Sequence, residues 1–377
     1  MSNFRAVGSR RWDTGETTEI VVSNGVIQLG VSDRDAVDVS GLIAAPGLID
    51  LQLNGGFGHD FTDDPSKIWV VASRLPEHGV TAFLPTIISS EPGAVMSARQ
   101  VILAGPPEGW EGATPIGLHC EGPMIAPSQR GTHSTKFLIN PSLDVVESWG
   151  GTEGVGMVTL APELPHAEEV VRHLLDAGVI VAAGHSDADF TEAMVSFGWG
   201  ISHGTHLFNA MSGFDHRRPG LAGALLATPS ATAGIIVDGH HLHPGTVKVI
   251  REAKRSSGIA LVTDAMAGMG MGDGTYRLGD IDVIVEGSRA SNAEGHLAGS
   301  VLTMDEAVRN FHAFTDCSWA EAIEAASVTP ASILNDPSRG RLTAGSRGDI
   351  TFFDETLHVQ MTVVGGRVVF DSDGRIN

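Results

Sequence analysis

The chain has 377 residues, with 24 Lys and Arg against 45 Asp and Glu, so its formal net charge at pH 7 is −21. This length suits one large domain with an appendage or two ordinary domains, and it excludes a peptide or a disulfide-stapled miniprotein. A hydrophobic content of 42% with 18% charged residues is typical of a globular protein. The acidic balance argues against nucleic acid or an anionic membrane as the main partner.

Two cysteines, Cys120 and Cys317, are too few for a disulfide framework and fit a reducing compartment. The first residues lack the charged start and apolar run of an export signal, and no later stretch is long and apolar enough to span a bilayer. We therefore expect a soluble cytoplasmic protein. The unusual features of the composition are 47 Gly and 16 His, which gather in the same few segments.

Both ends of the chain carry short strand patterns separated by turn residues. These patterns occupy residues 19–22, 25–29, 349–353 and 363–370. The last of them is broken by Gly365 and Gly366, which favour a tight hairpin turn. The patterns predict that both ends pair into one small β-domain, formed by residues 1–45 and 345–377.

Between these ends, short apolar runs alternate with helical periods. The predicted strands occupy residues 80–84, 116–119, 157–160, 179–183, 234–237 and 259–263. One helix is predicted from the apolar spacing of Ile68, Val71, Ala72 and Leu75, and a second from Pro244 to about residue 254. A third is predicted near Met304, where Thr303 and Glu306 have the spacing of a capping box. Alternating strands and helices predict an α/β fold with a parallel sheet, either open or closed into a (β/α)8 barrel.

We favour the closed (β/α)8 arrangement, a TIM barrel over residues 46–344. An open sheet that binds a dinucleotide should carry a glycine fingerprint after an early strand, and none is found there. Ionisable residues also follow strand after strand, which is where barrel active sites are built.

The strand ends of such a barrel converge on one face, so Glu121, His185, His206 and Asp264 can meet there. One carboxylate and two imidazoles suit Zn²⁺ or another divalent transition metal and leave a position for water. The metal would turn that water into a hydroxide nucleophile, while Asp264 takes a proton as general base and returns it as general acid. Taken singly, each residue has a simpler interpretation as a satisfied polar group, but the joint pattern predicts hydrolysis of an amide.

The motifs at these strand ends resemble a known family. In chain order they are APGLIDLQLNGG, HCEGP, GTHS, AAGHSDA, HLFNAM, RRPGLAGALL, DGHH, LVTDAM and LAGSVLTMDEAVRN. Their order over roughly residues 45 to 345 resembles the amidohydrolase superfamily and, within it, the deacetylases of N-acetylglucosamine 6-phosphate. The resemblance implies a barrel with a small β-sandwich built from both termini. It also implies removal of acetate to give glucosamine 6-phosphate, in amino-sugar recycling and cell-wall precursor supply.

The resemblance further implies roles for single residues. It assigns Glu121, His185 and His206 to the metal and Asp264 to acid/base catalysis. Arg217 and His241 would bind the phosphate, with Arg217 reaching across a homodimer interface, although a solvated turn is the simpler interpretation of that arginine. The implied substrate-binding residues are Thr132, His133, Asn209, Ala210, Arg217, Asp238, Gly239, His240, His241, Leu297, Ala298 and Gly299.

One segment departs from a pattern common in the superfamily. Many amidohydrolases hold a second metal with a His-x-His pair after the first barrel strand, whereas this chain has Gln52 and Asn54 there. Amides are poor ligands beside imidazole. We therefore expect one tightly held metal per chain, zinc in the first place with iron, cobalt or manganese as alternatives, and Gln52 and Asn54 near the vacant second site.

Two other functions stay open. The first is a cyclic-amide hydrolase or a deaminase of the same superfamily. Its dihydroorotase-like and hydantoinase-like members usually carry the His-x-His pair and a carbamylated lysine that bridges two metals, and Glu121 takes that bridging place here. A sugar-phosphate sensor without turnover would have no need of Asp264.

Overall fold

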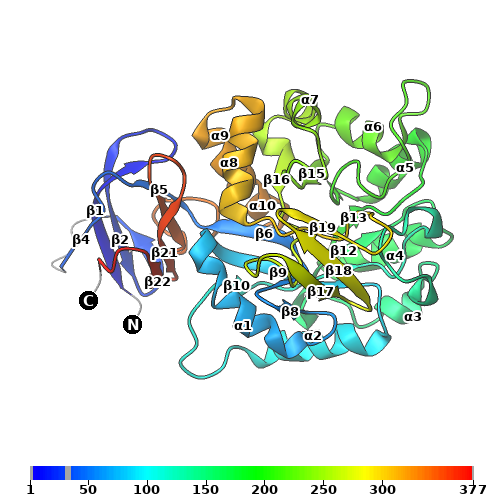
Figure 1. Cartoon of the computed structure of the whole chain (residues 1–377), viewed down its shortest axis with the longest axis horizontal. Coiled ribbons are helices and arrows are strands. Elements are labelled where there is room, and N and C mark those ends of the chain that lie inside the picture. The colour runs from blue at the N-terminus through cyan, green and yellow to red at the C-terminus, as the bar shows by residue number, and fades with distance from the viewer. Residues whose placement is uncertain (1–2, 30–34, 376–377) are drawn as a thin grey trace.

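The computed structural model describes residues 3–29 and 35–375, which form a barrel and a separate small sheet (Figure 1). The small sheet joins both ends of the chain, and β4 (Val37–Asp38) pairs with β1 (Phe4–Arg11). From edge to edge its other strands are β22 (Arg367–Asp371), β21 (Val359–Val364), β20 (Ile350–Phe353), β5 (Ile43–Pro46), β1 (Phe4–Arg11), β2 (Thr17–Ser23) and β3 (Val26–Gln28).

The small sheet folds over until strands from the two ends of the chain enclose a common core. Ile27 donates its N–H to the carbonyl of Ser346 at 2.8 Å, which brings β3 beside the segment that precedes β20. Phe4 packs with Phe352 inside this apolar core. The predicted terminal β-sandwich is therefore confirmed, while the exact limits of the two domains stay a prediction.

The barrel consists of parallel strands that pair in chain order. Its strands are β6 (Leu48–Leu53), β9 (Val80–Ile88), β11 (Leu118–Glu121), β12 (Val155–Leu160), β13 (Ile180–Ala183), β14 (His203–Gly204), β15 (Thr232–Ile235) and β16 (Ile259–Leu261), and the short β10 (Thr114–Pro115) adds to β9. Between β6 and β16 a single bridge, Leu53 to Ala265, closes the ring in the described residues. The predicted TIM barrel is confirmed.

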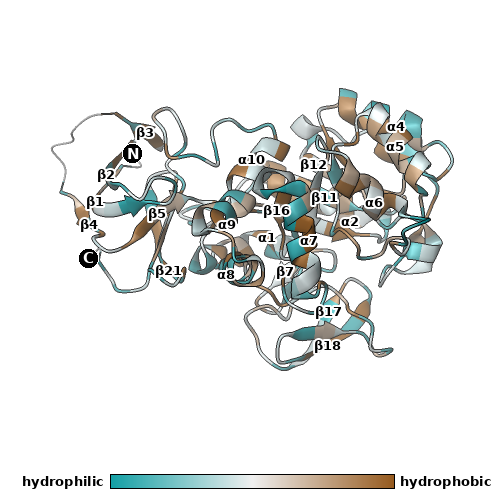
Figure 2. Ribbon diagram, turned by 90° about the horizontal axis from the view of Figure 1, so that it is seen from above, coloured by the Kyte–Doolittle hydropathy of each residue, from teal (hydrophilic) through white to brown (hydrophobic). Residues whose placement is uncertain are grey.

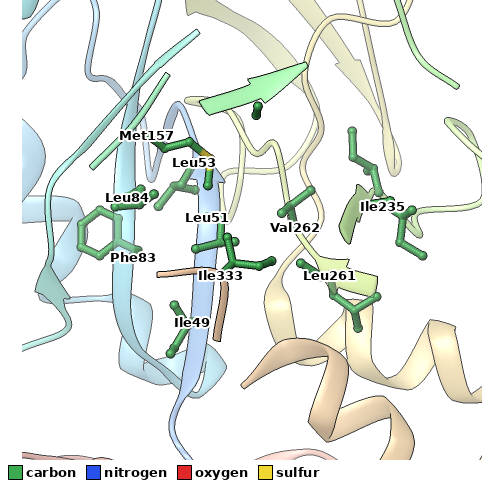
Figure 3. Close-up of a cluster of buried hydrophobic side chains, with 14 of the residues drawn as sticks. Ile49, Leu51, Leu53, Phe83, Leu84, Met157, Ile235, Leu261, Val262 and Ile333 are labelled. Atoms are coloured by element: carbon green, nitrogen blue, oxygen red, sulfur yellow. The ribbon is translucent and has the colours of Figure 1, made fainter. Parts of the chain in front are cut away.

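The main apolar core lies within and around this barrel. Figure 3 shows Ile49, Leu51 and Leu53 of β6 beside Phe83 of β9 and Ile333 of the last helix, and all belong to one buried cluster. Strands covered on both faces bury every side chain, which explains why their sequences read as continuous apolar runs. Burial of each large apolar side chain, such as a leucine, an isoleucine or a phenylalanine, stabilises the fold by about 1.5–3 kcal/mol.

Helices follow most of the barrel strands. They are α1 (Ile68–Ala72), α2 (Pro92–Ala104), α3 (Leu143–Val146), α4 (Ala167–Asp176), α5 (Phe190–Trp199), α6 (Gly220–Ala227), α7 (Pro244–Lys254), α8 (Met304–Thr315), α9 (Trp319–Ala326) and α10 (Val328–Ile333). The 3-10 turns are Pro65–Lys67, Leu75–His78, Pro127–Gln129, Thr135–Phe137, Gly151–Glu153 and Ser256–Gly258. In the described part of the chain, no helix has the length and apolar character to cross a bilayer.

The helices predicted around Ile68, at Pro244 and near Met304 are present, although the first ends at Ala72 and Leu75 lies in the next 3-10 turn. The capping box predicted at the last of these helices is not formed, because the side chain of Thr303 makes no capping hydrogen bond. Complete capping boxes occur instead at Asp189 in front of α5 and at Ser318 in front of α9. The spacing alone does not decide the rotamer that a box needs.

A three-stranded antiparallel sheet enters between β16 and α8, where the sequence patterns above predicted no strand. It comprises β17 (Gly274–Leu278), β18 (Ile281–Glu286) and β19 (Arg289–Ser291), and Figure 2 shows it projecting from the barrel. A small β7 (Gly55–Gly56) and β8 (His59–Asp60) hairpin follows β6. The inner face of the three-stranded sheet packs on Ile88, Met266 and Ala298, so the sheet covers part of the barrel mouth.

Candidate metal and active site

Glu121, His185 and His206 come together where three barrel strands end. Glu121 is the last residue of β11, and the two histidines follow β13 and β14. All three side chains are buried, and one ligand atom of each lies within 4.8 Å of the others. The structure thus brings together the residues that the sequence predicted as metal ligands.

The spacing of these three side chains can be tested against a metal ion. Oε1 of Glu121 lies 3.0 Å from Nε2 of His206 and 3.2 Å from Nε2 of His185, and the two nitrogens are 3.1 Å apart. Ligands held about 2.0–2.1 Å from a tetrahedral metal are themselves separated by roughly 3.3 Å. Two imidazole nitrogens and a carboxylate oxygen at this spacing fit a divalent transition metal.

Neighbouring groups orient this cluster. Nδ1 of His185 lies 2.9 Å from the carbonyl of Gln129, which leaves Nε2 to face Glu121. Burial alone would raise the pKa of Glu121, but the hydrogen bonds and charges of His185 and His206 hold that pKa well below its usual value. The carboxylate is therefore ionised, as a metal ligand must be.

Asp264 follows β16 and lies beside the cluster. Its Oδ1 accepts hydrogen bonds from Nδ2 of Asn54 at 2.7 Å and from Nε2 of Gln52 at 3.1 Å, and Gln52 also donates to Oε1 of Glu121 at 2.9 Å. Burial, followed by the charge of Glu121, raises the pKa of Asp264 to about 6. A carboxyl group with a pKa near the working pH suits general acid/base chemistry.

The backbone at these positions is strained. His185 has a φ of 49°, His206 of 29° and Asp264 of 49°, which places three non-glycine residues in the left-handed region. Each such residue costs about 1–3 kcal/mol and persists only where its surroundings fix it. Strain of this kind collects at functional sites.

A cavity of about 190 Å³ opens onto Glu121, His185, His206 and Asp264. Its other predicted lining residues are Asn54, Thr132, His133, Asn209, Ala210, His241, Leu297 and Gly299. Ile88, Ile236 and Leu278 also line it, although no polar motif in the sequence marked them. The cavity therefore joins a polar floor at the cluster with apolar walls, as small-molecule sites generally do.

His133 offers a hydrogen-bond donor to this cavity. Its Nδ1 accepts the N–H of Ser89 at 3.3 Å and lies 2.8 Å from Oγ of the same residue, and Nε2 lies 3.8 Å from Oε2 of Glu121. With Nδ1 as the acceptor, the proton of the neutral ring is on Nε2. Burial, followed by the charge of His185, lowers the pKa of His133 to about 3 and keeps the ring neutral. A neutral N–H directed at the cluster can bind a carbonyl or hydroxyl oxygen of a ligand.

Five residues predicted to bind substrate do not line the cavity. Asp238 accepts the Nδ1 proton of His241 at 2.7 Å and orients that ring, with Gly239 in the turn between them. His240 lies 2.9 Å from Oγ of Ser288 in the three-stranded sheet. Ala298 is buried in the apolar core beneath that sheet.

The fifth, Arg217, is exposed and lines a separate hollow with residues of α5 and the turn before α6. Among the described residues that line the cavity, none is a lysine or arginine.

Two buried residues beside Glu121 have no direct part in this geometry. His119 binds the carbonyl of Leu51 at 3.0 Å and Oγ1 of Thr159 at 2.7 Å inside the barrel, as expected for a structural histidine. Burial raises the pKa of the Cys120 thiol to about 12. That thiol is therefore protonated and unreactive, which argues against a redox role.

The chain resembles proteins of known activity. The model of the amidohydrolase family matches residues 43–369. N-acetylglucosamine-6-phosphate deacetylase of Rattus norvegicus is 40% identical over 89% of this chain and 85% of its own length. The deacetylase of the same name from Bacillus subtilis is 37% identical over 88% of this chain and 85% of its own length.

Solved structures agree with these relatives. The N-acetylglucosamine-6-phosphate deacetylase of Thermotoga maritima superposes with a TM-score of 0.87 at 32% identity, covering 99% of both chains. A mutant of the Mycobacterium smegmatis deacetylase in complex with N-acetyl-D-glucosamine-6-phosphate gives 0.86 at 28% identity, covering 98% of this chain and 100% of that one. The chain therefore belongs to the amidohydrolase family and, within it, to the group of N-acetylglucosamine-6-phosphate deacetylases.

Proposed function

We propose that this protein is a metal-dependent hydrolase that removes acetate from N-acetylglucosamine 6-phosphate and releases glucosamine 6-phosphate. The observation that carries this proposal is the meeting of Glu121, His185, His206 and Asp264 at one cavity in a chain whose relatives are deacetylases of this substrate. Its place would be amino-sugar recycling in the cytoplasm, where the two free, buried cysteines stay reduced.

Glu121, His185 and His206 would hold one divalent transition metal, and we propose zinc. When bound, such an ion supplies Lewis-acid polarisation of a carbonyl and activation of water. Gln52 supports a single tight site, because its NH₂ group faces the carboxylates of Glu121 and Asp264 and offers no acceptor to a second ion there. Two tightly held zinc ions per chain in a purified, zinc-soaked sample would contradict this part of the proposal.

Asp264 would move the proton. Both amide donors, Gln52 and Asn54, bond to its Oδ1, which leaves Oδ2 as the oxygen that takes a proton from the attacking water. The same atom then gives the proton to the nitrogen of the departing amine, so that a neutral amine and acetic acid form, and the acid loses its remaining proton to water to give acetate. A sugar-phosphate sensor without turnover would need no such group.

The phosphate is the part of the substrate that the cavity of one chain binds least well. Its lining holds His241 but, in the described chain, no lysine or arginine, while Arg217 lies exposed outside it. We propose that the protein forms a homodimer in which Arg217 of one chain reaches the phosphate in the cavity of the other. An arginine fork gives two charge-assisted bonds to a phosphate.

Kinetics with matched substrates test the function. We expect acetate release from N-acetylglucosamine 6-phosphate that stops after chelation and returns with zinc, and a much lower kcat/KM for unphosphorylated N-acetylglucosamine. Ammonia release from purines, or opening of a cyclic amide, without acetate release would favour the other amidohydrolase chemistries. Tight binding of the sugar phosphate without turnover would favour a sensor.

A further inference from the structure

The seam where the barrel closes lies directly beneath Asp264. In the described chain no strand ladder joins β6 to β16, and the only β-bridge across this seam joins Leu53 of β6 to Ala265, which follows β16. Three backbone hydrogen bonds cross the seam here: Asp264 donates to the carbonyl of Gln52 at 2.9 Å, and Asn54 and Gly55 donate to the carbonyl of Ala265 at 2.8 and 3.2 Å. The seam is thus held by a few bonds around the residue that would transfer the proton.

Asp50 adds a side-chain clamp to this seam. It is buried on β6, two residues before Gln52 and therefore on the same face of the strand. Its Oδ2 accepts the hydroxyl proton of Thr263 at 2.5 Å, and its Oδ1 accepts the N–H groups of Gln52 at 3.1 Å and Thr263 at 3.3 Å. One carboxylate therefore ties the first barrel strand to the residue that precedes Asp264.

Ser300 holds the same turn from the opposite side. Its Oγ donates to the carbonyl of Thr263 at 2.6 Å, and its N–H donates to the carbonyl of Asp264 at 2.8 Å. Ser300 and Thr263 are buried, so these bonds are shielded from water. Asp264 lies between the two clamps with a left-handed backbone, a conformation that needs such support.

We infer that Asp50, Thr263 and Ser300 are positioning residues, which act by fixing the backbone of Asp264 so that its carboxyl group faces the metal ligands. None of the three lines the cavity, so each would act through Asp264 and not by touching substrate. This inference rests on the proposed function for its kinetic consequences, but its structural content is independent of activity. A misplacement of about 1 Å can cost about 100-fold in rate.

Thr263→Val tests the clamp, because valine keeps the shape of threonine and removes only the hydroxyl. We expect kcat to fall by about 10- to 100-fold while KM and zinc affinity by chelator competition change less than about threefold. Thr263→Ser restores the hydroxyl and should restore kcat. Thr362→Val is the matched control, since Thr362 is buried in the small sheet and its hydroxyl makes one hydrogen bond, to Pro76, at 2.8 Å.

Amide hydrogen exchange over residues 263–266 gives a readout that needs no turnover. Protection there should drop in Thr263→Val and in Ser300→Ala but not in Thr362→Val. The inference is overturned if protection is unchanged in both seam variants, or if Thr263→Val loses no more kcat than Thr362→Val does. If Thr263→Val does not fold, the exchange protection and the kcat of Ser300→Ala, each compared with Thr362→Val, decide the inference. Absence of acetate release by the parent protein would overturn the proposed function, whereas the exchange data would still decide the clamp.

Discussion

Replacing Asp264 by Asn separates proton transfer from every other property of the site. Both hydrogen bonds to Asp264, from Gln52 and Asn54, end on Oδ1. An asparagine can place its carbonyl oxygen there and keep both bonds, with its NH₂ group at the position of Oδ2. The variant is therefore expected to fold, to bind zinc and to bind substrate, but it can neither accept nor return a proton.

The expected size of the effect follows from that single loss. General acid/base catalysis by a positioned side chain contributes about 10²- to 10⁴-fold, so kcat should fall by that factor, or about 3–5 kcal/mol in activation free energy. KM should stay within about threefold, because a change confined to the transition state leaves ground-state binding intact.

Acetate release at saturating substrate measures this loss, with zinc content determined on the same sample. Asp60→Asn is the matched control, because Asp60 is a buried carboxyl group outside the cavity. The reasoning is refuted if Asp264→Asn keeps kcat within about threefold of the parent, well short of the loss of an acid/base group. If the zinc content of the variant fell in proportion to its kcat, Asp264 would instead be identified as a metal ligand.

Further predictions concern the metal, the phosphate and stability. Glu121→Gln removes the anionic donor between two imidazoles and should weaken zinc binding at least about 100-fold in a chelator competition, and an unchanged affinity would exclude Glu121 as a ligand. Arg217→Ala should raise KM about 10- to 100-fold for the phosphorylated sugar only, and a similar rise for unphosphorylated N-acetylglucosamine would contradict a phosphate contact. Lys254→Met deprives three carbonyls at the end of α6 of their donor and should cost about 2–3 kcal/mol in urea unfolding, with a change under about 0.5 kcal/mol speaking against the cap. Burial raises the pKa of Asp60 from 3.8 to about 6, so its contribution to stability is complete below pH 4 and is lost as pH rises through 6. Relative to the parent, Asp60→Asn should gain up to about 3 kcal/mol between pH 4 and pH 8, and a pH-independent difference would contradict the raised pKa.

The meeting of the three proposed metal ligands could be predicted because barrel topology brings distant strand ends together. Glu121 and His185 are separated by 64 residues, yet each follows a buried strand, and all such strands end on one face of a TIM barrel. The helix start at Pro244 could also be predicted from the sequence, since proline in the first helical turn is a local signal. Local sequence signals, together with the rule that barrel strands end on one face, were enough to predict these features.

Other features depend on contacts that no local pattern records. The strand at His203 and Gly204 is two residues long and exists because β13 and β15 flank it. The three-stranded sheet did carry a signal, namely alternating residues between the turns at Gly279 and Gly287. The position of Arg217 outside the cavity could not be predicted from the local sequence, because an exposed turn carries no record of distant contacts, and only the family resemblance implied it.

The left-handed backbone at His185, His206 and Asp264 has a consequence for engineering this protein. Glycine is the residue that such dihedral angles favour, so replacing any of the three by glycine would relieve conformational strain while removing a side chain that we propose takes part in the reaction. A library screened for heat resistance alone would have no reason to retain these side chains. Thermostabilisation should therefore hold positions 185, 206 and 264 constant, or score every round by turnover as well as by melting temperature.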